Sequence, residues 1–372
     1  MRLLFVEQHP RFIGGSERMS LTLCRHAKQR GHETWLAYAE EGDMVPAYAA
    51  AGAHCCQVPS LPVAVRQPLT ALRSFTSLWR MAHSARIDLL FTSQVNYVSL
   101  VAAVGRAVGA RTAVHLGLVY DYPSPLFRTG TWLIDLGVAP SAHTAEGWRV
   151  CGWPAQSLRV IPNGVDTTAF MPGDGRPAAR ARLGLVGVQG PVIAYVGRIV
   201  REKGILTLMR AFARHRRSRG EGHLMVVGLA PADEASSLTA TARDEGVPDH
   251  AWEVRPPTPT PEDVYRAADI VVVPSECEEA FGLVPLEAMA CGTLAIVSDR
   301  AGLPEFVAPL GQDAVFVAGN PEDLRLRLDF WLTDGGRRDR AALQMAAHTR
   351  AEYAFDACAD AYLTAFQSLV SG

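Results

Sequence analysis

Two glutamates, Glu279 and Glu287, lie eight positions apart where a polar loop meets an apolar segment of helical character. Gly282 leads into this segment, Pro285 stands near its start and Gly292 lies just past its end, as helix boundaries favour. Carboxylates accept hydrogen bonds from hydroxyl groups, and the first N–H groups of a helix can bind phosphate oxygens. The pattern therefore predicts a site for a ligand with both hydroxyls and phosphates, such as a sugar nucleotide. Two solvated loop glutamates are the alternative.

The chain contains only two lysines, Lys28 and Lys203, beside thirty-four arginines. Arg198 comes just after an apolar run of strand length, Val192–Val196. Lys203 follows Arg198 by five positions and lies at the start of the next helical segment. A guanidinium binds phosphate through two parallel hydrogen bonds, and an ammonium supplies a movable point charge. The pair predicts a diphosphate site. Loop cations are more often solvated, but the scarcity of lysine makes that reading less attractive here.

Gly14 and Gly15 follow the first apolar run and precede a helical segment over Glu17–Arg30. Paired glycines let the backbone approach a ligand closely, and a helix start attracts phosphate. A second phosphate contact is one interpretation of this motif. A tight turn between a strand and a helix is the other.

Short apolar runs alternate with helical segments, and these elements must position the residues above. The expected strands are Leu3–Val6, Thr34–Tyr38, Leu89–Thr92, Thr112–His115 and Leu136–Ala139 in the first half, and Val192–Val196, Leu224–Val227, Ile270–Val273 and Leu294–Val297 in the second. This alternation is typical of parallel sheets built from β-α units. The fold class predicted is α/β, with two Rossmann-like, doubly wound domains in series.

Turn-rich segments over 161–166 and 173–177 indicate a linker, and we place the domain boundary near Thr168. The expected domains are 1–168 and 169–351. Residues 352–372 contain a last helix, Phe355–Val370, whose apolar residues recur at helical spacing. That helix needs a surface to cover, and we expect the N-terminal domain to supply it.

The composition argues against a membrane-spanning protein, a zinc protein and a nucleic-acid-binding protein. The chain has 372 residues, a net charge of −2 and 48% hydrophobic residues, which is typical of a soluble globular protein. No apolar stretch is long enough for a spanning helix, and Glu7 interrupts the apolar start before a signal peptide could form, so we expect a cytoplasmic protein. Seven cysteines without a C-x-x-C pair argue against zinc. A mild basic excess over 1–168 suggests an anionic acceptor or surface rather than nucleic acid.

At these motifs the sequence resembles the retaining glycosyltransferases of family four (glycosyl transferases group 1), which have the GT-B fold of two Rossmann-like domains facing a cleft. The resemblance rests on four motifs that span most of the chain. They are Gly14-Gly15-Ser16-Glu17, Pro162-Asn163-Gly164-Val165-Asp166, the Gly197-Arg198 to Lys203-Gly204 loop, and the run from Glu279 to Glu287 with Phe281-Gly282-Leu283 inside it.

The resemblance implies a role for each site residue. The Gly14-Gly15 backbone would contact the donor phosphates, and Arg198 and Lys203 would neutralise the leaving diphosphate. Glu279 would bind the donor sugar and Glu287 the ribose. The backbone of Phe281, Gly282 and Leu283 would complete the donor site, and His115 would lie near the anomeric carbon. A structural role at the end of its strand is the alternative for His115.

The implied reaction transfers a hexose-type sugar from a nucleotide diphosphate sugar to a hydroxyl of a glycan, a lipid-linked or a small-molecule acceptor, with retention of configuration. No Asp-x-Asp triplet occurs, so we expect no metal and no other cofactor. The chain departs from the family at Gly228-Leu229-Ala230-Pro231 and Pro256-Pro257, near the expected base pocket. The identity of the donor's nucleotide base stays open, and UDP is favoured over GDP only by its frequency in the family.

Other interpretations stay open at this point. A sugar-nucleotide epimerase or hydrolase would use the same fold without an acceptor, and a non-catalytic nucleotide-sugar sensor would lack catalytic residues that are intact here. Acceptor contacts are expected from His9, Arg11 and the loops over 59–68 and 119–125. The helix expected over Leu69–Arg86 has a basic edge that could contact the inner face of an anionic membrane, although a packed domain helix is favoured.

Overall fold

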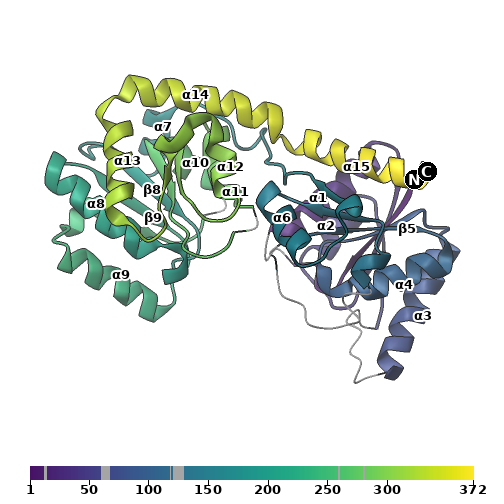
Figure 1. The fold of residues 1–372 in the computed structure, drawn as a ribbon. Helices are drawn as coiled ribbons and strands as arrows, with labels where there is room; N and C mark the ends of the chain where they lie inside the picture. Colours follow the sequence, from purple (N-terminus) through teal and green to yellow (C-terminus); the bar gives the residue numbers. More distant parts are fainter. Residues whose placement is uncertain (12–14, 60–67, 118, 120–129, 259, 280) are drawn as a thin grey trace. The chain divides into compact units, whose positions relative to one another are not determined.

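The computed structural model describes residues 1–11, 15–59, 68–117, 119, 130–258, 260–279 and 281–372 (Figure 1). The chain divides into two compact units. Unit 1 contains Met1–Gly164 and Phe355–Gly372, and unit 2 contains Val165–Ala354. The chain therefore leaves unit 1 four residues before Thr168 and returns to it where the last predicted helix begins.

A seven-stranded parallel sheet forms the centre of unit 1. Its strands are β1 (Arg2–Glu7), β2 (Glu33–Tyr38), β3 (His54–Gln57), β4 (Leu89–Thr92), β5 (Arg111–His115), β6 (Leu136–Ala139) and β7 (Leu158–Val160). The spatial order is β3-β2-β1-β4-β5-β6-β7. The winding reverses between β1 and β4, and doubly wound sheets bind ligands at such a reversal, beyond the carboxyl ends of the strands.

Within the described residues, the helices of unit 1 are α1 (Gly15–Gln29), α2 (Val45–Ala50), α3 (Pro68–Ser84), α4 (Val98–Val108), α6 (Ala142–Val150) and α15 (Phe355–Ser371), with 3-10 turns η1 (Val95–Tyr97) and η2 (Ala155–Ser157). These helices lie between the strands of the sheet along the chain, except for α15, which follows unit 2.

Unit 2 repeats the plan with six parallel strands. They are β8 (Val192–Val196), β9 (His223–Val227), β10 (Trp252–Arg255), β11 (Ile270–Val273), β12 (Leu294–Ser298) and β13 (Val315–Phe316), in the order β10-β9-β8-β11-β12-β13. Its reversal lies between β8 and β11. The two sheets confirm the predicted fold class of two doubly wound α/β units.

The helices of unit 2 are α7 (Arg176–Arg182), α8 (Ile205–Arg219), α9 (Ala232–Asp244), α10 (Pro261–Ala267), α11 (Leu283–Ala290), α12 (Leu303–Val307), α13 (Pro321–Thr333) and α14 (Gly335–Glu352), with 3-10 turns η3 (Arg201–Lys203), η4 (Asp249–Ala251) and η5 (Ala308–Ala314). A helix follows each strand of unit 2, α7 precedes β8, and α14 directly follows α13.

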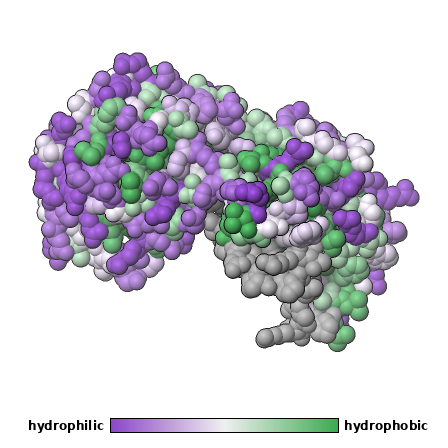
Figure 2. All heavy atoms as spheres, viewed as in Figure 1, coloured by the Kyte–Doolittle hydropathy of each residue, from purple (hydrophilic) through white to green (hydrophobic). Residues whose placement is uncertain are grey.

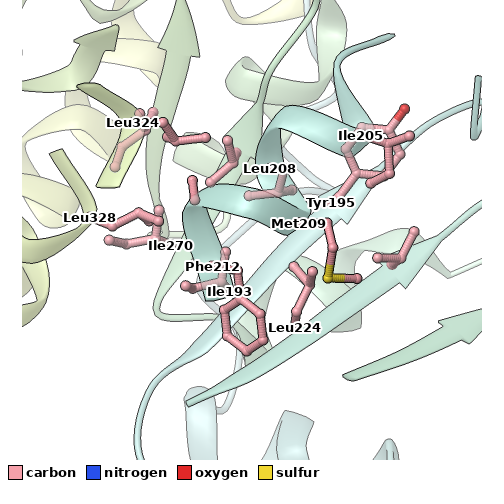
Figure 3. Close-up of a cluster of buried hydrophobic side chains, with 14 of the residues drawn as sticks. Ile193, Tyr195, Ile205, Leu208, Met209, Phe212, Leu224, Ile270, Leu324 and Leu328 are labelled. Atoms are coloured by element: carbon pink, nitrogen blue, oxygen red, sulfur yellow. The ribbon is translucent and has the colours of Figure 1, made fainter. Parts of the chain in front are cut away.

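Helix α8 packs on the sheet of unit 2 and anchors the segment that carries Lys203. Leu208, Met209 and Phe212 are fully buried in one cluster with apolar residues of β8, β9 and β11 (Figure 3). Burying a side chain of this size contributes about 1.5–3 kcal/mol. Since Lys203 ends η3 only two residues before α8 begins, this packing fixes the backbone at the lysine.

The C-terminal helix α15 packs into unit 1. Tyr362 and Phe366 are buried and hold their rings 6.1 and 5.7 Å from the ring of Phe91 on β4. Asp360 accepts a hydrogen bond from Arg30 and lies 2.8 Å from Nε2 of His26. Apolar and polar contacts thus join the end of the chain to the first helix and a central strand.

Helix α3 packs through Ser74, Leu78 and Ala82, while Leu69 and Leu72 are exposed. In the view of Figure 2, apolar surface gathers over α3 in unit 1. The packed domain helix favoured by the sequence agrees with these buried residues, and a membrane contact stays a prediction. Within the described ranges, every helix is too short or too polar to cross a bilayer.

Candidate functional site

The loop after β8 presents Arg198 at the reversal of the unit 2 sheet. Gly197 has a φ of 153°, which favours glycine. The Tyr195 hydroxyl donates a hydrogen bond of 2.5 Å to the carbonyl oxygen of Arg198, which holds the backbone in place. The Arg198 side chain is 68% exposed and lies 3.5 Å from Glu202. An anchored backbone therefore carries an accessible guanidinium.

Lys203 and Glu279 are in direct contact. Lys203 Nζ lies 2.5 Å from Glu279 Oε1, and both side chains are less than one fifth exposed. The hydroxyl of Ser275, just beyond β11, donates to the same oxygen at 2.6 Å. Ser275 is buried, and its own carbonyl accepts a hydrogen bond from the buried Ser298 hydroxyl at 2.6 Å. The carboxylate is thus held from two sides.

Backbone contacts bring the loops after β8 and β11 together. The carbonyl oxygen of Glu202 accepts hydrogen bonds from the N–H groups of Glu276 and Cys277, at 2.9 and 3.1 Å. Gly204 has a φ of 72°, and a Cβ there would lie 1.7 Å from the carbonyl oxygen of Pro274. Only glycine permits this approach, so Gly204 is required for Lys203 to reach Glu279.

The segment that enters α11 is also tightly packed. Gly282 has a φ of 80°, and a Cβ there would lie 2.8 Å from the Leu303 side chain. Phe281 is buried, with its ring centroid 4.5 Å from that of Phe306. Leu283 begins α11, whose first turn has no acidic residue. The first N–H groups of this helix can therefore attract an anion without a competing carboxylate in that turn.

Glu287 lies on α11 and accepts a hydrogen bond of 2.6 Å from the Tyr265 hydroxyl. Tyr265 is fully buried. Burial, together with the adjacent Glu287 carboxylate, raises the pKa of Tyr265 well above its ordinary value, so the phenol stays protonated and donates. Tyr265 thereby orients the Glu287 carboxylate.

The predicted donor-site and catalytic residues of unit 1 are His115 and the two glycines, whereas residues 60–67 and 120–125 of the expected acceptor loops lie outside the described residues. Gly15 is the first residue of α1, whereas Gly14 lies outside the described residues. His115 ends β5, is 1% exposed, and has its Nδ1 3.0 Å from the Tyr362 hydroxyl. Burial lowers the pKa of His115 to about 4, so its ring is neutral at neutral pH.

Glu7 is another buried titratable residue of unit 1, and the sequence did not single it out as a site residue. It ends β1, next to β4, and is buried. Ser20 of α1 donates to Oε1 and Ser93, just after β4, donates to Oε2, each at 2.7 Å. Burial raises the pKa of Glu7 to about 7, against the opposing effect of the two serines. The carboxyl therefore ties α1 to the β4 loop at the reversal of the unit 1 sheet.

The structure brings some of the predicted residues of unit 2 together and leaves others apart. Lys203 and Glu279 form a pair, Arg198 contacts Glu202 at the edge of the same loop, and Glu287 has a separate partner in Tyr265. Ser275 and Tyr265 were missed. The position of Ser275 directly after the Ile270–Val273 strand was a usable signal. Among the described residues, no three His, Cys, Asp or Glu side chains are arranged as metal ligands.

Two family descriptions match the chain. Glycosyltransferase Family 4 matches residues 13–169, and Glycosyl transferases group 1 matches residues 184–348. The chain belongs to glycosyltransferase family 4. The second match contains every predicted site residue of unit 2.

Curated relatives of this glycosyltransferase share part of its length. The D-inositol 3-phosphate glycosyltransferase of Segniliparus rotundus is 37% identical over 221 residues, which covers 58% of this chain and 48% of the relative. D-inositol 3-phosphate glycosyltransferase 1 of Catenulispora acidiphila is 35% identical over 248 residues, 64% of this chain and 58% of the relative. The chain spans about half the length of the curated relatives it matches.

Solved structures confirm the GT-B fold of this glycosyltransferase. HepE of Anabaena in complex with UDP matches with a TM-score of 0.84 at 18% identity, over 99% of this chain and all of HepE. A glycosyltransferase of Rickettsia africae matches with a TM-score of 0.86 at 16% identity, over 99% and 98% of the two chains. HepE has also been solved with UDP-glucose.

Proposed function

We propose that this glycosyltransferase moves a hexose-type sugar from a nucleotide diphosphate sugar to an acceptor hydroxyl, with retention of configuration and without a metal. One observation carries the proposal. At the reversal of the unit 2 sheet, the Lys203 ammonium and the Glu279 carboxylate lie 2.5 Å apart, on two loops joined by backbone hydrogen bonds. This contact supports the proposal, because an ammonium can bind a phosphate and a neighbouring carboxylate can accept hydrogen bonds from sugar hydroxyls.

Each proposed role follows from the charge that develops in the reaction. As the bond between the anomeric carbon and the phosphate oxygen breaks, negative charge grows on the diphosphate. Arg198, Lys203 and the first N–H groups of α11 would stabilise that charge, and their backbone anchors would keep them close to where it develops. Glu279 would bind the sugar hydroxyls, and Glu287, oriented by Tyr265, would bind the ribose.

The donor base and the acceptor are proposed more broadly. UDP is favoured over GDP, supported by the UDP and UDP-glucose complexes of HepE. The acceptor would be a hydroxyl of a glycan, a lipid-linked or a small molecule. The relatives named D-inositol 3-phosphate glycosyltransferase make a phosphorylated polyol the first small molecule to try.

His115 is proposed to lie near the anomeric carbon, as the family resemblance implies. Its neutral ring, buried against Tyr362, supports a hydrogen-bonding role rather than a cationic one. Two variants separate this role from packing. His115→Ala should lose far more transfer than Tyr362→Phe, whereas equal small losses would assign His115 to packing alone.

A transfer assay tests the proposal. UDP- and GDP-sugars are each incubated with D-inositol 3-phosphate, a glycan and a lipid-linked glycan, in buffer containing EDTA. We expect transfer from one donor class, with the product retaining the anomeric configuration by proton NMR. Lys203→Ala should nearly abolish it. Nucleotide release that proceeds equally fast without any acceptor would instead favour a hydrolase or an epimerase.

A further inference from the structure

The contact between Lys203 and Glu279 joins two groups that the proposed function assigns to different parts of the donor. The ammonium is assigned to the diphosphate, and the carboxylate to the sugar. Their side chains are 19% and 18% exposed, so solvent and salt screen this pair less than an exposed one. A ligand that binds one of the two groups therefore changes the interactions of the other.

The two parts of a nucleotide sugar affect this pair in opposite ways. A diphosphate brings negative charge to Lys203 and therefore close to the Glu279 carboxylate, so two anions then share one ammonium and repel each other. Sugar hydroxyls have the opposite effect, because they donate hydrogen bonds to a carboxylate. Glu279 thus disfavours a bare diphosphate and favours a sugar attached to it.

Glu279 has little freedom to move away from the diphosphate. The Ser275 hydroxyl donates to Oε1 at 2.6 Å, and Ser275 is itself fixed by the buried Ser298. When the ammonium turns toward a phosphate, Ser275 still holds the carboxylate in position. Ser275 is therefore a positioning residue for Glu279.

We propose that Glu279, by competing for Lys203, makes the site select a nucleotide sugar over the free nucleoside diphosphate. The inference rests on the proposed function and adds a consequence for turnover. Once the sugar has been transferred, the nucleoside diphosphate faces a carboxylate without its hydroxyl partners. Its release is favoured by the same residue that helped to bind the donor.

Binding of inorganic pyrophosphate tests the selection without knowledge of the base. Isothermal titration calorimetry compares the wild type with Glu279→Gln, Lys203→Ala and the double variant. Glu279→Gln should bind pyrophosphate about tenfold more tightly, a typical size for coupling between two sites. The double variant should bind as weakly as Lys203→Ala, because the gain passes through the ammonium.

Glu278→Gln is the matched control, since it removes the same charge from the neighbouring exposed residue. We expect its pyrophosphate affinity to stay within twofold of the wild type. A gain equal to that of Glu279→Gln would mean that general charge repulsion, not competition for Lys203, sets the affinity. Circular dichroism melting curves confirm that each variant is folded.

The remaining outcomes separate this inference from the proposed function. If Lys203→Ala loses pyrophosphate but Glu279→Gln gains nothing, the selection is refuted and the diphosphate assignment stands. If Lys203→Ala binds as the wild type does, the diphosphate assignment itself is wrong. If no variant binds pyrophosphate, UDP or GDP, the proposed function fails.

Ser275→Ala tests the positioning role with a different readout. It should raise the KM for the nucleotide sugar severalfold, and it should tighten pyrophosphate binding by less than Glu279→Gln does, because Glu279 can then move away from the diphosphate. Ser275→Thr, which keeps the hydroxyl, should restore the KM. Equal effects of both variants on KM would overturn the positioning role.

Discussion

The buried Glu7 carboxyl makes the stability of unit 1 depend on pH in a direction unusual for a carboxyl group. Burial raises the pKa of Glu7 from 4.5 to about 7 in the folded protein. Below pH 4.5 the group is protonated in both folded and unfolded states and has no effect. Between pH 4.5 and 7 the unfolded chain loses the proton first, so the free energy of unfolding falls as pH rises. One pKa unit corresponds to about 1.4 kcal/mol, so the loss at pH 8 reaches about 3 kcal/mol.

The substitution Glu7→Gln removes this titration and keeps the shape of the side chain. The amide oxygen can accept from Ser20 while the amide nitrogen donates to Ser93, so both contacts at 2.7 Å are preserved. We expect the variant to exceed the free energy of unfolding of the wild type by less than about 1 kcal/mol at pH 5 and by up to about 3 kcal/mol at pH 8.

Urea denaturation from pH 5 to 8 measures this difference. Tryptophan fluorescence is a suitable probe because five of the seven tryptophans belong to unit 1. Glu33→Gln, an exposed glutamate at the start of β2, is the matched control and should follow the wild type at every pH. A difference between Glu7→Gln and the wild type that stays constant with pH would refute the reasoning.

Two further predictions concern unit 2. Gly204→Ala should destabilise the unit by at least about 2 kcal/mol, from the left-handed φ and the collision with Pro274, and should abolish pyrophosphate binding. Gly246→Ala is the control, because Gly246 has a φ of 70° and an added Cβ would meet nothing within 4 Å. This variant has the backbone strain without a collision, and it should lower the free energy of unfolding by about 1 kcal/mol in the same urea titration. Equal losses in the two variants would contradict the role of the collision with Pro274. Tyr265→Phe removes the donor to Glu287 and should weaken UDP or GDP binding about tenfold while leaving pyrophosphate binding unchanged, as calorimetry can measure. A parallel loss of pyrophosphate would instead mean that the loop itself had moved.

The strands that the sequence predicted are those in the interior of the two sheets. Each has an apolar run because it is covered on both faces. The four strands that it missed, β3, β7, β10 and β13, are the outer strands of the two sheets. Most residues of β3, β7 and β10 are exposed or half-buried, and β13 has only two residues. No apolar run marks such strands, so hydrophobic pattern alone could not reveal them.

The candidate site was predictable where one motif contained the residues. The segment from Glu279 to Glu287 and the loop from Arg198 to Lys203 each lie within ten positions. The contacts between motifs were not predictable, because Lys203 and Glu279 are 76 positions apart and Glu7 and Ser93 are 86 apart. Glu7 interrupts an apolar run, but nothing in the sequence shows that two distant serines bind it.

The return of α15 to unit 1 has a consequence for how the chain folds during synthesis. Unit 2 is continuous from Val165 to Ala354 and can complete its core as soon as those residues leave the ribosome. Unit 1 is made first in its larger part, yet Phe91 lacks its partners Tyr362 and Phe366 until the last helix is made. The first unit to begin folding is therefore the last to finish, and its apolar surface stays open to aggregation or chaperone binding while unit 2 is translated.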